Sequence, residues 1–134
     1  MPMIEFSERY ILQGKVITPA WYRMRINTVG EATSKDGGST NYPVDGTVLF
    51  NGDTGDKEFT GTPLIWNFNS KALGFATGFL KSLGVEVESG KRYDLKAAEG
   101  MEIDVFIEND TYQGRLVNRV NHKYRPIRAD VKAA

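Results

Sequence analysis

The sequence predicts a mainly β domain with one helix, in which five antiparallel strands follow one another and the helix lies between the third strand and the fourth. Two observations support this fold class. Four segments alternate apolar with polar residues, which is the period of a strand with one buried face. Residues 71–83 instead repeat apolar residues at the spacing of a helix face. A chain of 134 residues is long enough for one domain with its own core.

The first strand is predicted at Ala20–Val29. One of its faces is apolar, and the other begins with a tryptophan followed by two arginines: Trp21, Arg23 and Arg25. Because Trp21 shares its face with arginines, it is either a partly covered structural residue or a ligand contact. Residues 1–18 are weakly patterned and are expected to form an N-terminal arm. Residues 30–41 are polar and glycine-rich, which indicates a loop.

The second strand is predicted at Val44–Asn51 and the third at Glu58–Phe68. The residues between them, 51–56, are asparagine, glycine, aspartate and threonine, which favour a turn and therefore a hairpin. Gly61 and Pro63 lie inside the third strand and indicate a bend, a bulge or an exposed edge there.

The helix is predicted at Lys71–Leu83. Ser70 is placed to cap its first amides, and Gly84 is placed to end it in the left-handed conformation. The apolar residues that form its expected buried face are Ala72, Leu73, Phe75, Ala76, Phe79, Leu80 and Leu83.

The fourth and fifth strands are predicted at Met101–Glu108 and Thr111–Asn121, joined by a tight turn at Asn109–Asp110. Residues 127–134 are expected to form a flexible C-terminal tail. The order strand, strand, strand, helix, strand, strand is typical of the five-stranded antiparallel OB-fold barrel, in which a helix between strands 3 and 4 closes one end. A β-sandwich of different topology is the alternative.

The net charge is zero, with 17 basic and 17 acidic residues, but the charges are segregated. Residues 9–25 contain basic and no acidic side chains, and residues 111–134 contain six basic side chains against Asp130 alone. If these two segments lie side by side, they form a cationic stripe suited to a polyanion. The alternative is that the basic residues are scattered over solvated faces.

The residue types argue against an enzyme, a metal site and a bound cofactor. Cysteine is absent, His122 is the single histidine, and the glycine-rich segment at Asp36–Ser39 lacks the lysine of a phosphate-binding loop. Acidic residues at 102, 104 and 108 share one strand face. They either gather a divalent cation or, as favoured here, are solvated or paired with arginines of the neighbouring strand.

Single-stranded nucleic acid is bound by cations that follow its backbone and by aromatic rings that stack on its bases. The first and last strands contain both residue types, and the third strand adds two aromatic residues, Trp66 and Phe68, which either pack in the core or stack on bases. The residues predicted to bind nucleic acid are Trp21, Arg23, Arg25, Trp66, Phe68, Arg115, Arg119, Lys123, Tyr124 and Arg125.

A set of motifs is spread from Pro19 to Pro126: Pro19–Ile26, Asn67–Asn69, Ala72–Gly74, Phe79–Val85 and Val117–Val120. With these motifs the chain resembles a family of bacteriophage-encoded single-stranded DNA-binding proteins with an OB-fold. The resemblance implies a non-sequence-specific DNA-binding protein of phage replication or recombination, located in the cytoplasm of an infected bacterium. It implies single-stranded DNA, or RNA, as partner, together with other phage replication proteins or further copies of the chain, and no membrane. The alternative is a phage structural or adaptor protein that binds another protein through a face of the barrel, because tryptophan, tyrosine and arginine also populate protein interfaces.

Overall fold

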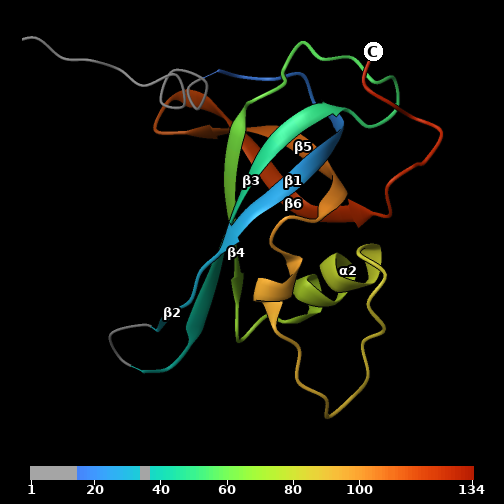
Figure 1. Cartoon of the computed structure of the whole chain (residues 1–134). Helices are drawn as coiled ribbons and strands as arrows, with labels where there is room; N and C mark the ends of the chain where they lie inside the picture. Colours follow the sequence, from blue (N-terminus) through green and yellow to red (C-terminus); the bar gives the residue numbers. More distant parts are fainter. Residues whose placement is uncertain (1–14, 34–36) are drawn as a thin grey trace, which may run out of the picture.

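Strand β1 (Ala20–Val29) lies at the centre of one antiparallel sheet in the computed structural model, which describes residues 15–33 and 37–134 (Figure 1). It pairs with β3 (Thr40–Asn51) on one side and with β5 (Glu102–Tyr112) on the other. The predicted bounds of the first strand are confirmed, since apolar residues alternate along it and fill the core.

The outer strands continue the sheet in both directions. Strand β4 (Pro63–Asn69) pairs with β3, β6 (Arg115–Arg125) pairs with β5, and the short β2 (Ala32–Thr33) pairs with the far end of β3. The helix α2 (Gly74–Ser82) follows β4 and packs against β6, and a single 3₁₀ turn, η1 (Leu95–Ala98), precedes β5. The mainly β class with a helix after the third long strand is therefore confirmed, in one sheet rather than two stacked ones.

The sheet is not closed into the predicted barrel. Its path ends at β4 and β6, and these strands share no ladder in the described part of the chain. Aromatic side chains lie between the two edges instead. The ring of Phe68 is 6.2 Å from that of Tyr124 and 5.4 Å from that of His122, centroid to centroid. These rings pack against one another at the seam between β4 and β6.

The inward faces of the strands and one side of α2 form a single core. Trp66 and Phe68 belong to it, with exposed fractions of 6% and 1%. Only three residues of α2 are buried: Ala76, Phe79 and Leu80. The predicted helical face was therefore too wide at its start, where Leu73 and Phe75 are half exposed.

The helix begins three residues later than predicted, and Ser70 does not cap it. The Ser70 hydroxyl instead accepts a hydrogen bond from the amide of Thr40 at 2.8 Å, which fastens the end of β4 to β3. The predicted C-terminal end is confirmed. Gly84 has φ +87°, its amide donates to the Lys81 carbonyl, and the Val85 amide donates to the Leu80 carbonyl, the paired bonds of a glycine-terminated helix.

The turn between β5 and β6 is not at Asn109–Asp110 but at Gln113–Gly114. Both turn residues have positive φ, +50° and +77°, as a two-residue turn of type I′ requires. The hairpin is therefore longer than predicted at its tip, and β6 continues to Arg125. The third predicted strand is shorter, because β4 starts only at Pro63, and the predicted loop at 30–41 contains β2.

The C-terminal segment, residues 127–134, was predicted to be flexible but packs on the outer side of β1. Val131 is 8% exposed, its carbonyl accepts a bond from the Arg23 guanidinium, and the amide of Ala134 donates to the carbonyl of Gly55 at 2.8 Å. Of the predicted N-terminal arm, residues 1–14 lie outside the described residues. The described end of the arm is fastened to β6, because the Asn118 side chain bonds the backbone of Lys15 and Ile17.

We expect Gly55→Ala to release this C-terminal segment. A Cβ at Gly55 would overlap the carbonyl oxygen of Lys132, and its φ of +79° disfavours any other residue by about 1–2 kcal/mol. Hydrogen exchange at Val131 and Ala134 should accelerate. Gly90→Ala is the matched control, since its φ is +80° and its Cβ would meet nothing within 4 Å. Equal exchange in both variants would contradict the contact.

Candidate nucleic-acid interface

Two aromatic rings and two cations meet on the outer side of β1, β5 and β6, and we call Trp21, Phe106, Lys123 and Arg125 the outer-face cluster. Trp21 and Phe106 are register partners on β1 and β5, and their rings meet edge to face at 5.4 Å. The Arg125 guanidinium lies 4.5 Å from the Trp21 ring centre, and the Lys123 ammonium lies 5.3 Å from that of Phe106. Each ring is therefore covered by one cation from β6.

A buried ion network lies beside this cluster. Asp104 is fully buried and pairs with Arg23 at 3.4 Å and with Arg125 at 3.0 Å. Arg125 also binds Asp53 at 2.6 Å. The Arg23 guanidinium donates to the carbonyls of Arg128 and Val131 and lies 4.8 Å from the Phe50 ring. With 7% exposure, Arg23 is a structural residue beneath the C-terminal segment and is not accessible to a phosphate, contrary to its prediction as a contact.

The remaining predicted cations alternate with the acids of β5. Arg119 pairs with Asp110, and Lys123 pairs with Glu108 at 3.1 Å. Arg25 donates to Asn27 at 3.1 Å and, like Arg115, forms no ion pair with any described residue. The basic side chains of β1 and β6 do lie on one face of the sheet, but β5 passes between these strands and supplies carboxylates. The predicted cationic stripe is therefore a face of mixed charge.

Three predicted aromatic contacts belong to the core. Trp66 and Phe68 point inward from β4, and Tyr124 lies between Phe68 and the helix residue Phe79. Burial raises the pKa of the Tyr124 phenol well above its usual value. Of the two alternatives left open for Trp66 and Phe68, core packing is the one that this structure adopts.

Sequence reasoning did not single out two accessible aromatic features. One is Phe106, which the sequence could have revealed because it lies among acidic residues on the outward face of β5. The other is Phe75, which is 52% exposed and stacks on His122 at 4.3 Å with an angle of 17°. A bulge in β6, where His122 has φ +54°, turns this ring towards α2. Burial, with a smaller contribution from Arg119, lowers the pKa of the His122 imidazole.

The comparisons with known proteins give no family: no protein-family model matches the chain, and no curated protein matches it. None of the helices in the described part is long and apolar enough to cross a membrane. Nor do the described residues place three or more histidine or acidic side chains where they would hold a metal ion. What the outer face does provide is aromatic surface next to exposed cations.

Proposed function

We propose that the protein binds single-stranded DNA without sequence specificity, on the outer face of β1, β5 and β6, and acts in phage replication or recombination. The observation that supports this most is the outer-face cluster. Two outward aromatic rings in contact offer bases a surface for stacking, and the exposed Lys123 beside them offers a phosphate a cation.

We further propose that the sheet is an OB-fold with an open seam. The strand order β4–β3–β1–β5–β6, with the helix after β4, is the order of that fold, and β4 and β6 are the strands that would close it. Fold alone does not determine function, so the proposal depends on the residues of the outer face.

Phosphates would compete with carboxylates for these cations. The pairs Arg119–Asp110 and Lys123–Glu108 are largely exposed, and solvent screening leaves such surface pairs little net stabilisation. Replacing a carboxylate by a phosphate is therefore inexpensive, and Arg25 and Arg115 need no exchange at all. Each neutralised phosphate should add about −0.7 to the slope of log affinity against log salt concentration.

We expect Trp21→Ala to weaken oligo(dT) binding by about fivefold to a hundredfold, because stacking contributes about 1–3 kcal/mol per base. The two tryptophans give an internal control. Trp66 is buried, so DNA should quench the fluorescence of Trp21 in a Trp66→Phe protein and leave Trp66 unquenched in a Trp21→Phe protein. Unchanged affinity in Trp21→Ala, together with unquenched Trp21, would remove this cluster from the interface.

Protein binding is the alternative function, and one observation favours it. The tip of the β5–β6 hairpin exposes Tyr112 and Leu116, with exposed fractions of 65% and 58%. Titration of labelled oligo(dT) at low and high salt separates the two functions. Tight, salt-sensitive binding to single strands with weak binding to duplex supports the DNA-binding proposal, whereas absence of binding at low salt supports an adaptor.

A further inference from the structure

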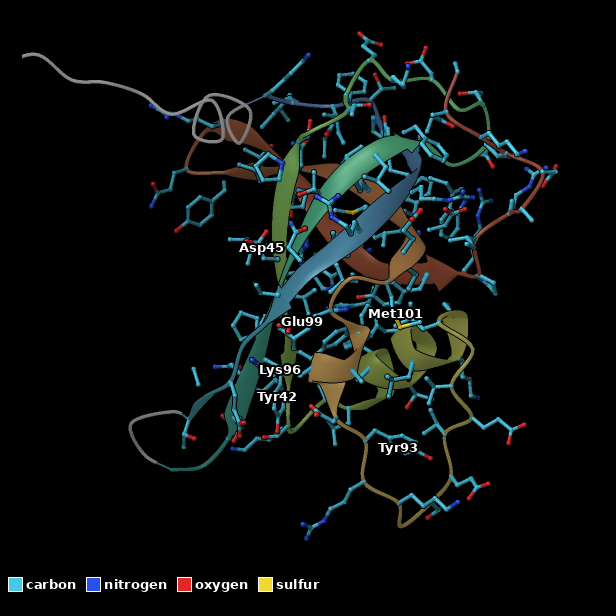
Figure 2. The ribbon with its side chains drawn as sticks, in the orientation of Figure 1. Tyr42, Asp45, Tyr93, Lys96, Glu99 and Met101 are labelled. Carbon is cyan, nitrogen blue, oxygen red and sulfur yellow. The ribbon has the colours of Figure 1, made fainter. Side chains whose placement is uncertain are left out.

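A cavity of about 790 Å³ lies between α2, the loop that leads from α2 to η1, and the ends of β1 and β3. Its volume is in the range of small-ligand sites. The walls include Leu80 from the helix, Val87 and Leu95 from the loop and the 3₁₀ turn, and two tyrosines, Tyr42 and Tyr93. Figure 2 shows Tyr93 on the loop between α2 and η1, and Tyr42 on β3.

Some polar groups of this cavity have no partner in the described part of the chain. The Tyr93 hydroxyl accepts a bond from the Glu88 amide, but the half-buried Tyr42 hydroxyl bonds no described residue. Among the lining charges, Lys91 pairs with Glu88 at 2.6 Å, and the Asp94 carboxylate bonds the amide of Lys96. Within the described chain this leaves the side chains of Arg92 and Lys96 without an ion pair, and likewise two lining carboxylates, those of Glu31 and Asp94.

Two tyrosine walls, together with a hydroxyl and two cations that have no partner in the described chain, fit a planar heterocycle that bears a phosphate. We infer that the cavity receives one unstacked base of the bound single strand, with the neighbouring phosphate held by Arg92 and Lys96. This inference rests on the proposed function. Strand β1 connects the two sites, because it begins at the outer-face cluster with Trp21, exposes Arg25 midway, and ends at Val29 in the cavity wall (Figure 1).

The test follows backbone amide signals of the full chain by NMR, with dTMP, thymidine and the oligonucleotide dT10 as probes. We expect dTMP and dT10 to shift the amides of Thr77 and Lys96, which line the cavity. The double variant Arg92→Ala/Lys96→Ala should bind dTMP at least about tenfold more weakly and thymidine equally well, because only the phosphate contact is removed. The matched control is Lys57→Ala/Lys71→Ala, which removes two exposed cations outside the cavity.

The outcomes separate this inference from the proposed function. If dT10 shifts the indole signal of Trp21 but neither cavity amide, the base pocket is wrong while DNA binding on the outer face stands. If dTMP shifts the cavity amides and dT10 does not, the occupant is a free nucleotide, and the inference about the strand is overturned. If dT10 shifts neither site, the proposed function itself fails.

Discussion

Asp104→Ala is expected to lower the free energy of unfolding by about 3–5 kcal/mol. Asp104 is fully buried and pairs with two guanidinium groups, those of Arg23 and Arg125. Arg125 retains Asp53, but Arg23 would remain 7% exposed with only backbone carbonyls as partners. An uncompensated buried charge is among the largest effects that one substitution produces.

Urea denaturation measures this loss. We expect the urea concentration at the midpoint to fall, while the slope of the unfolding free energy against urea concentration stays the same. Asp104→Asn separates charge from volume, because it keeps the size of the side chain and should still be strongly destabilised. Glu108→Ala is the matched control on the same face of β5. Its partner Lys123 is exposed, so we expect a change within about 1 kcal/mol. Equal stability of the Asp104 and Glu108 variants would show that the buried network contributes nothing.

Phe68→Ala is expected to lower the free energy of unfolding by about 3–5 kcal/mol through the cavity it leaves. Its ring is 1% exposed and lies 5.2 Å from Phe79 and 6.2 Å from Tyr124. Phe75→Ala on the neighbouring helix is the control. Phe75 is half exposed, so this variant should lose much less stability than Phe68→Ala.

A second variant decides whether Phe68 has any part in DNA binding. Phe68→Leu keeps an apolar side chain in the core but cannot stack on a base. If the residue acts only in packing, Phe68→Leu should bind oligo(dT) as the unchanged protein does. A weaker affinity at full folding would mean that Phe68 leaves the core when DNA binds.

The local patterns predicted the elements well because each depends on neighbouring residues. The alternation of apolar and polar residues sets the bounds of β1. Gly84 ends α2 because a residue without a Cβ readily adopts the left-handed conformation. The turn of the last hairpin was misplaced because Asn109–Asp110 and Gln113–Gly114 both suit a turn. The choice between them came from the pairing of β5 with β6, in which Ile107 opposes Val120 and both are buried.

The candidate site was predicted less well, because it depends on which strands become neighbours. Sequence patterns placed Trp21 on an outward face, and the structure keeps it there. They did not show that Asp104 would lie between Arg23 and Arg125, or that the C-terminal segment would cover Arg23. Nor did they show Phe106 next to Trp21, since that contact joins residues 85 positions apart in the printed sequence.

The sequence by itself therefore determined the mainly β class, the place of α2 in the chain and the inward faces of β1 and β5, because hydrophobic periodicity is a local property. The tertiary structure alone decided whether the sheet closed, which cations remained free and which aromatic rings stayed outside. Those outcomes depend on packing between distant segments. Aromatic side chains of β4 and β6 pack against each other where no ladder joins these strands, and carboxylates of β5 pair with the cations on which the predicted interface depended.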